Sequence, residues 1–164
     1  MKKLLLTLVV ATMAIVTGNA AGNTVQLDLN SVSTSGKFSD NFSPSLFSAG
    51  GTTFTIVKEN GNELEVEVNV PFEAEEPIQI KTVNYLEASL SYWDKDDNSF
   101  DLSPIPFDMT QAADLIKFLG TKHDENTSVK VFRFKGTIKK SEWEAYSKAD
   151  SHFLNIMCVS FTEK

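Results

Sequence analysis

The sequence has few cysteine, histidine and arginine residues, and each shortage excludes a class of protein. Cys158 is the only cysteine, so no disulfide can form within the chain and its stability must come from packing. Two histidines and this cysteine, separated by 29 and 6 residues, match no zinc-binding spacing. Arg133 is the only arginine and acidic residues outnumber basic ones by 22 to 15, so we expect neither a nucleic-acid partner nor binding to anionic membranes.

The usual sequence signs of catalysis are also missing. The chain has no G-x-S-x-G elbow, no glycine-rich phosphate loop and no dinucleotide-binding fingerprint. Cys158 follows His152 by six residues, which is about 20 Å along an extended strand, so these side chains could not touch within one strand. Cys158 is best explained as a small buried apolar residue. We therefore expect no enzyme, and we keep as an alternative a hydrolase that combines His123 or His152 with carboxylates.

The N-terminal segment Met1–Ala21 has the three parts of a secretory signal peptide. Two lysines form a basic start, an uncharged apolar run covers Leu4–Val16, and small residues follow. This run is shorter than the roughly 20 apolar residues of a membrane-spanning helix. We expect cleavage after Ala20 or Ala21, an exported bacterial protein in the periplasm or outside the cell, and no membrane insertion after cleavage. The remaining residues 22–164 have the length of one β-rich domain.

The clearest structural signal is Thr52–Phe72, where apolar and polar residues alternate on both sides of Asn60-Gly61. A period of two indicates strands with one buried face, and Asn-Gly between such strands indicates a hairpin turn. A two-residue turn at Asn60-Gly61 would place Ile56 opposite Glu65. We prefer a loop of odd length centred on Gly61, because it gathers the apolar residues on one face. That loop would pair Lys58 with Leu64, Ile56 with Val66, and Phe54 with Val68.

Five further segments have the alternation or the short apolar runs that indicate strands. They are Thr24–Leu29, Ile78–Trp93, Phe100–Phe107, Val129–Ile138 and Phe153–Phe161.

Four of these segments have features of their own. Ile78–Trp93 is long for one strand, so we expect a bend or bulge near Thr82–Asn84 that divides it or lets it cross between sheets. In Phe100–Phe107, two prolines should end the strand. The parity shift within Val129–Ile138 indicates a bulge or a strand buried on both faces. Phe153–Phe161 is apolar on both parities, as in a central strand covered on both faces.

Capping signals indicate two helices. Asp108 and Gln111 have the spacing of a capping box, and an apolar stripe at i, i+3, i+4 and i+7 follows them. Ser141 and Glu144 repeat the spacing as S-x-x-E. These signals predict a helix over 109–119 and a short helix near 142–148. With the strands, they predict a mainly β fold, an antiparallel β-sandwich of about seven or eight strands. A small closed β-barrel with a helix is the alternative.

The segment Asn30–Gly51 is rich in serine, glycine, asparagine and threonine, and it contains phenylalanines but no clear alternation. Irregular segments of this length are uncommon in compact domains and are often functional. Phe38, Phe42 and Phe47 are therefore candidate partner-binding residues. The structural alternatives are a loop that its phenylalanines pin across the sheet, and a loop that hides a short strand.

The stretch Asp94–Ser99 begins like a calcium-binding loop, with the pattern D-x-D-x-N. Ser99 replaces the required glycine and Ile105 stands where the bidentate glutamate belongs, so this is not an EF-hand. An irregular calcium site remains a hypothesis beside the simpler interpretation, an acidic hairpin turn, and we expect no other cofactor. The candidate calcium ligands are Asp94, Asp96, Asn98 and Asp101.

Aromatic residues beside polar ones are the candidates for binding a carbohydrate or another small ligand. Tyr92 and Trp93 precede the acidic turn, and Trp143 and Tyr146 lie on one side of the short helix expected near 142–148. Such rings bind sugars only where they are exposed, and most aromatic rings in a sandwich belong to the core. An outward-pointing Trp93 at the mouth of the acidic turn would favour a sugar.

Together these features predict an exported, non-enzymatic domain that binds a protein or cell-envelope partner through Asn30–Gly51 or a sheet edge. The alternative is a carbohydrate- or small-ligand-binding module that calcium supports. The sequence does not identify the partner.

Overall fold

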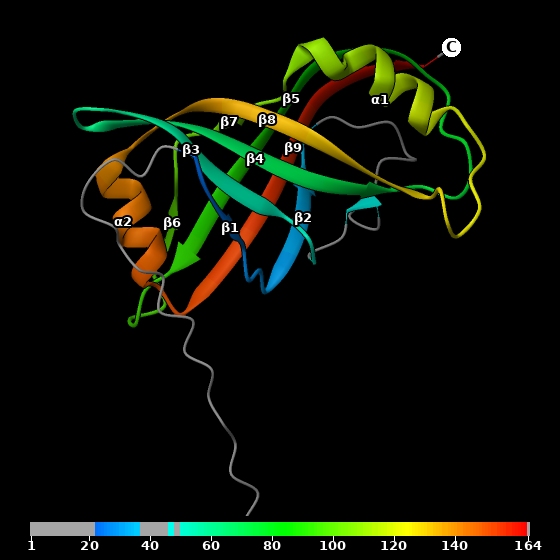
Figure 1. Ribbon diagram of the computed structural model, residues 1–164. Coiled ribbons are helices and arrows are strands. Elements are labelled where there is room, and N and C mark those ends of the chain that lie inside the picture. Colours follow the sequence, from blue (N-terminus) through cyan, green and yellow to red (C-terminus); the bar gives the residue numbers. More distant parts are fainter. Residues whose placement is uncertain (1–21, 37–45, 48–49, 164) are drawn as a thin grey trace, which may run out of the picture.

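The computed structural model describes residues 22–36, 46–47 and 50–163, with side chains up to Cys158. The predicted signal peptide, Met1–Ala21, and the candidates Phe38 and Phe42 lie outside the described residues. The described chain forms two open β-sheets on either side of a hydrophobic core, with a helix at each end (Figure 1). The predicted mainly β sandwich is therefore confirmed, and the closed barrel is not formed.

The strands are β1 Asn23–Gln26, β2 Ser31–Ser35, β3 Thr53–Asn60, β4 Glu63–Glu73, β5 Ile80–Trp93, β6 Ser99–Asp101, β7 Ile105–Pro106, β8 Val129–Lys139 and β9 Ser151–Glu163. The four-stranded sheet has the order β1-β3-β4-β8, and the five-stranded sheet has the order β2-β9-β5-β6 with β7 also paired to β5. All described strand pairs are antiparallel except β2 with β9, which is parallel. The prediction of antiparallel pairing thus holds for every pair but one.

The hairpin of β3 and β4 forms as expected, but its turn is shorter than predicted. Asn60 pairs with Glu63, so the turn consists of Gly61 and Asn62. Gly61 has φ +62°, in the left-handed region that glycine enters without steric cost. The prediction of an odd-length loop centred on Gly61 is therefore wrong.

A bulge at Val57 nevertheless brings the apolar residues of the hairpin onto one face. The register shifts between Ile56 and Lys58, and Lys58 faces Glu65 instead of the predicted Leu64. An extra residue in one strand moves every later side chain by one position, so the bulge does what an odd loop would have done. Two predicted apolar pairs are therefore confirmed, Ile56 with Val66 and Phe54 with Val68.

The N-terminal part of the described chain differs from the predicted single strand. β1 ends at Gln26, and Leu27 and Leu29 are buried in the connection that follows. The backbone N–H of Leu27 donates to the Thr52 carbonyl at 2.9 Å. β2 is the short hidden strand that the sequence left open as an alternative, and it lies parallel to β9.

β5 runs as one strand of 14 residues, so the prediction that it divides is wrong. Its register against β9 shifts near Thr82 and around Tyr85, which confirms the expected irregularity. The prolines do not end the pairing that follows, because Ile105 and Pro106 of β7 pair with the same strand. A proline is tolerated there because β7 is a short strand at the edge.

Both alternatives for β8 are wrong. Its pairing with β4 is unbroken, so it has no bulge. Val129 and Val131 are each 50% exposed, so the strand is not buried on both faces. Phe132 and Phe134 belong to the core, and the two valines belong to the opposite face.

β9 is a central strand, as predicted, because it lies between β2 and β5. Leu154, Ile156 and Cys158 are buried on its inner face. Phe153 and Met157 on the opposite face are only partly buried. Full burial of both faces is therefore a wrong prediction for this strand.

The first predicted helix forms as a 3₁₀ turn, η2 Met109–Gln111, followed by α1 Ala112–Leu119. Asp108 caps it, because its carboxylate accepts hydrogen bonds from the Thr110 backbone N–H at 3.1 Å and the Thr110 hydroxyl at 2.7 Å. Gln111 does not complete the predicted capping box. Its side-chain oxygen accepts a hydrogen bond from the Arg133 backbone N–H at 2.7 Å, which ties the helix to β8.

The second helix, α2 Lys140–Lys148, begins before the predicted start, and the S-x-x-E box is wrong. Glu142 forms the box instead, since its carboxylate accepts from the Lys139 backbone N–H at 2.7 Å. The same carboxylate accepts from the Ser103 backbone N–H at 3.1 Å and hydroxyl at 2.9 Å. This glutamate therefore fixes α2 to the loop between β6 and β7.

We expect Asp108→Ala to lower the free energy of unfolding by about 1 kcal/mol at pH 7, the usual cost of losing a helix cap. The pKa of Asp108 lies below its usual value because the Thr110 hydroxyl and then the Arg133 guanidinium, with Nη2 at 2.7 Å, favour the ionised carboxylate. A lowered pKa contributes stability above the unfolded-state pKa, and this contribution disappears as the pH falls through the folded-state pKa.

Urea denaturation at pH 7 and pH 3 checks this prediction, because the difference between the variant and the unmodified protein should shrink at the lower pH. Asp114→Ala is the control, since Asp114 forms an exposed pair with Lys130 at 3.6 Å and should change stability by less than about 0.5 kcal/mol. An equal effect of both substitutions at pH 7 would contradict the assigned cap.

Candidate functional site

The five-stranded sheet has one face on the core and one face directed away from it. Leu90 of β5 pairs with Leu154 of β9, and both are fully buried. Because successive side chains of a strand point to opposite faces, their neighbours along each strand point outward. We call these outward residues the outer face. It comprises Ser31, Ser33 and Ser35 of β2, Phe153, Asn155 and Met157 of β9, Tyr85, Glu87, Ser89, Ser91 and Trp93 of β5, and Asp101 of β6.

An aromatic pair lies at one end of the outer face. Trp93 is 46% exposed, and its ring centroid lies 5.3 Å from that of Phe153 at an angle of 43°. The two side chains come from adjacent strands in a diagonal arrangement, since Trp93 pairs with Ser151 and Phe153 pairs with Ser91. Sugar rings and other flat, partly apolar groups can stack on such a surface.

Polar side chains occupy the middle of the outer face in a fixed arrangement. The Ser33 hydroxyl donates to Asn155 Oδ1 at 3.1 Å, and Asn155 Nδ2 donates to the Ser35 hydroxyl at 2.7 Å. These bonds join β2 to β9 through side chains as well as through the backbone. They also orient hydroxyl and amide groups before any ligand binds, which lowers the entropy cost of binding.

A glutamate and a tyrosine mark the other end of the outer face. Glu87 is 4% exposed and accepts a hydrogen bond from the hydroxyl of the exposed Tyr85. This bond raises the pKa of Tyr85, because ionisation would remove the donated proton and place a second negative charge beside the carboxylate. The tyrosine oxygen keeps its lone pairs and can accept a hydrogen bond from a ligand.

The acidic turn next to Trp93 uses its first aspartate to hold the backbone. Asp94 Oδ1 accepts hydrogen bonds from the backbone N–H groups of Asp96 at 2.8 Å and Asn98 at 2.9 Å. The hydrogen bonds from Asn98 lower the pKa of Asp94. Asp101 lies apart on β6, opposite Ser91. Within the described chain, no three histidine, cysteine, aspartate or glutamate side chains are gathered for a metal.

The other three aromatic candidates lie in or against the core. Trp143 stacks on Phe54 with ring centroids 3.9 Å apart, and Tyr146 is fully buried. Burial raises the pKa of Tyr146, with a smaller contribution from the charge of Asp28. Tyr92 packs against Tyr146 edge to face, with ring centroids 6.3 Å apart. Of the four predicted rings, only Trp93 is placed outward, at the mouth of the acidic turn.

The described member of the phenylalanine set is also buried. Phe47 forms an isolated bridge with Phe72 of β4, and the two rings meet edge to face at 4.6 Å. Phe47 therefore pins its segment to the four-stranded sheet, as one of the structural alternatives foresaw. Its side chain is not presented to a partner.

The histidines and the cysteine have structural positions. His123 Nε2 lies 2.7 Å from the Phe118 carbonyl oxygen, and His152 Nε2 lies 2.7 Å from the Tyr146 carbonyl oxygen. Cys158 is buried on the inner face of β9. Each histidine ring is thus anchored to the backbone of the last turn of a helix, α1 for His123 and α2 for His152.

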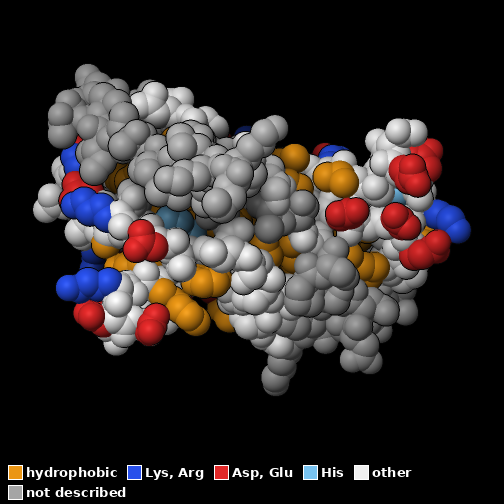
Figure 2. Space-filling model, turned by 90° about the horizontal axis from the view of Figure 1, so that it is seen from below, with side chains coloured by type: hydrophobic (Ala, Val, Ile, Leu, Met, Phe, Trp, Pro, Cys, Tyr) orange, Lys and Arg blue, Asp and Glu red, His pale blue; other side chains and the backbone are white. Residues whose placement is uncertain are grey.

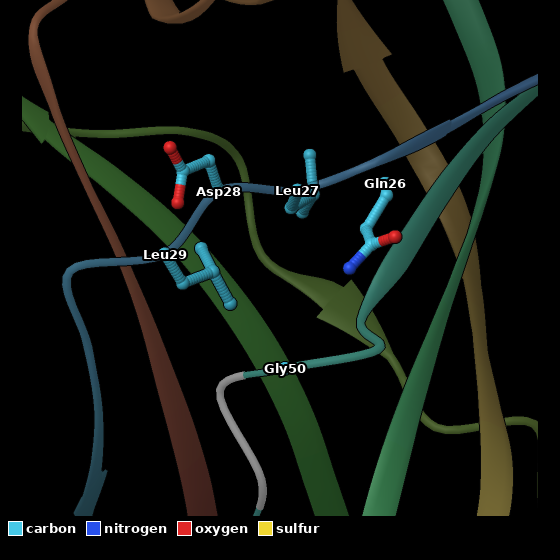
Figure 3. A pocket seen from close by; sticks show the side chains of 5 residues that line it. All are labelled: Gln26, Leu27, Asp28, Leu29 and Gly50. Carbon is cyan, nitrogen blue, oxygen red and sulfur yellow. The ribbon is translucent and has the colours of Figure 1, made fainter. Parts of the chain in front are cut away.

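A shallow pocket of about 300 Å³ lies beside the connection between β1 and β2. Figure 3 shows the side chains of Gln26 and Leu29 on the side of Gly50, whereas Asp28 points the other way. The residues that line the pocket include one amide and one acidic residue and no basic one. Sequence reasoning did not indicate this pocket, because its residues belong to no motif.

Sequence reasoning named Trp93 but missed Phe153, Asn155 and the serines that share the outer face with it. The alternation of Ser31, Ser33 and Ser35 was the available sign of a strand. Val32 is the only apolar residue between these serines, so the usual alternation of apolar and polar residues was missing. Figure 2 shows the molecule from below, where hydrophobic side chains reach the surface beside acidic and basic ones.

Comparisons with protein-family models, curated proteins and solved structures found no match for this chain. Neither described helix has the length and apolar character needed to cross a membrane.

Proposed function

We propose that the protein is an exported, non-enzymatic β-sandwich domain that binds a carbohydrate of the cell envelope through the outer face. The observation that carries this proposal is the outward, 46% exposed Trp93 beside Phe153 on a face of serine and asparagine side chains. A sugar ring has C–H groups that pack on an aromatic face and hydroxyl groups that need polar partners. This face supplies both kinds of contact on rigid strands.

The composition of the outer face favours a carbohydrate over a protein partner. Protein interfaces have an apolar core surrounded by a polar rim. Here the middle of the face is polar, around Asn155, and the exposed aromatic ring lies at one end. Phe47, the described phenylalanine proposed for partner binding, is buried against Phe72.

Export and the absence of a metal requirement belong to the same proposal. Export is inferred from the signal-peptide pattern of Met1–Ala21. We leave calcium out because the Asp94 carboxylate already accepts hydrogen bonds from the turn that it begins. The outer face has no nucleophile paired with a base, which supports binding without catalysis.

Trp93→Ala should weaken binding to the preferred glycan by about tenfold or more, because it removes the stacking surface. A glycan array identifies the ligand, and calorimetry with that glycan measures the dissociation constant. Phe100→Ala is the matched control. Phe100 is 45% exposed on the neighbouring strand, but it pairs with Tyr92 on the inner side and stacks on that ring at 5.3 Å.

Melting curves of both variants establish that each is folded before binding is compared. Equal loss of affinity in Trp93→Ala and Phe100→Ala would contradict a site on the outer face. An array without any bound glycan would contradict the proposed function itself.

A further inference from the structure

We infer that the outer face binds an extended glycan with free amino groups, which lies along β5 from Trp93 to Tyr85. This inference rests on the proposed function and adds the charge and the extent of the ligand. It is based on the negative charge and the hydrogen-bond acceptors of the outer face.

The charged residues of the outer face all have the same sign. Glu87 and Asp101 are acidic, and no lysine or arginine occurs in β2, in β6, in β5 from Tyr85 to Trp93 or in β9 from Ser151 to Cys158. The exposed Lys81 of β5 precedes this stretch. Three further aspartates and a single lysine occupy the turn beside Trp93. An anionic glycan would be repelled by this surface, whereas ammonium groups would be attracted.

Glu87 strengthens this negative potential although a ligand cannot reach it directly. It is 4% exposed, and among the described residues it forms no ion pair. A buried charge is screened by water and salt much less than an exposed one, so its field extends over the face. A buried carboxylate is costly without a nearby positive charge, and a bound ammonium group would lower that cost.

The hydrogen-bonding groups of the outer face also favour a ligand that donates. The Tyr85 hydroxyl proton is committed to Glu87, so the tyrosine oxygen faces a ligand as an acceptor. Asp101 is exposed and can only accept when ionised. An ammonium group provides three donors, which matches these acceptors better than an acetylated amine does. Beside Trp93, an ammonium group can in addition interact with the ring face.

The separation of these groups sets the extent of the ligand. Trp93 and the exposed Tyr85 are eight residues apart on one strand, which corresponds to roughly 26 Å. A single sugar cannot contact both ends of such a face. The ligand is therefore a chain of several sugar units.

The test uses three probes of similar length: a chitosan hexamer with free amino groups, the fully N-acetylated chitin hexamer, and a galacturonate hexamer that carries carboxylates. Calorimetry at low ionic strength should show about tenfold tighter binding of the chitosan hexamer than of the chitin hexamer. The galacturonate hexamer should not bind. Added salt should reduce the advantage of the chitosan hexamer.

Asp101→Asn should weaken binding of the chitosan hexamer by about threefold and leave the chitin hexamer unaffected, since one exposed charge contact is lost. Glu73→Gln is the control, because it removes the same charge from an exposed position on β4 in the other sheet. An equal effect of both substitutions would show nonspecific attraction to an acidic protein and overturn the inference.

Two further outcomes separate this inference from the proposed function. Equal binding of the chitosan and chitin hexamers, lost in both cases in Trp93→Ala, would overturn the inference and support the proposed function. Binding of none of the three probes, together with an array that has no bound glycan, would overturn both.

Discussion

Replacing Phe54 by alanine should lower the free energy of unfolding by about 3–5 kcal/mol, the range for removing a large aromatic side chain from a core. Phe54 is fully buried, and its ring stacks on Trp143 with centroids 3.9 Å apart. It also pairs with Val68 in the centre of the hairpin. The substitution therefore leaves a cavity between the four-stranded sheet and α2, which neither can fill without moving.

Guanidinium denaturation followed by circular dichroism measures this effect. Val57→Ala is the matched control, because Val57 lies in the bulge of the same strand and is exposed. Its removal should change stability by less than about 0.5 kcal/mol. A loss below about 1 kcal/mol in Phe54→Ala would mean that α2 does not pack on the sheet through this ring.

Gly36→Ala should destabilise the protein by more than about 2 kcal/mol through two separate effects. Gly36 has φ +98°, where a residue with a Cβ atom is strained. The added Cβ atom would also lie 2.3 Å from the carbonyl oxygen of Cys158. That oxygen belongs to the central strand β9, so it cannot move away without disturbing the five-stranded sheet.

Gly61→Ala separates the two effects. Gly61 also has a left-handed φ, +62°, but no atom lies within 4 Å of the position that a Cβ atom would take. Gly61→Ala should therefore lower the free energy of unfolding only by the cost of the left-handed backbone conformation, about 1–2 kcal/mol. Urea denaturation of both variants measures the difference. Equal losses would mean that β9 gives way to the new methyl group.

Local patterns predicted the parts of the fold that depend on neighbouring residues. The two-residue period of Leu64–Phe72 and the Asn-Gly dipeptide were sufficient for the hairpin, and the apolar stripe before Gly120 was sufficient for α1. The turn length was not predictable, because a bulge at Val57 and an odd loop place the apolar side chains on the same face. Either solution satisfies the hydrophobic pattern.

Contacts between distant parts of the chain could not be predicted in this way. β2 consists of small polar residues around Val32, and it is a strand because Ser33 and its neighbours bond to β9, 122 residues further on. Glu142 caps α2 partly because it also holds Ser103. The spacing of Ser141 and Glu144 was equally compatible with a capping box. Only the contact with Ser103, which lies in another loop, favours the box that Glu142 forms.

The candidate site was predictable only in part for the same reason. Trp93 could be named from its position before an acidic turn, but its outward direction depends on the parity of β5 relative to the core. Phe153 belongs to an apolar run that suggested burial on both faces. Its role as the neighbour of Trp93 follows from the pairing of β5 with β9.

The place of β9 in the five-stranded sheet has a consequence for how the protein is made. β9 lies between β2 and β5, yet it is the last of these strands to be synthesised. Until it emerges from the ribosome, β2 and β5 have no strand to join them, and closing so long a loop slows folding. The middle of the five-stranded sheet is therefore completed only after nearly the whole chain has been made, whereas β5 can pair earlier with β6 and β7.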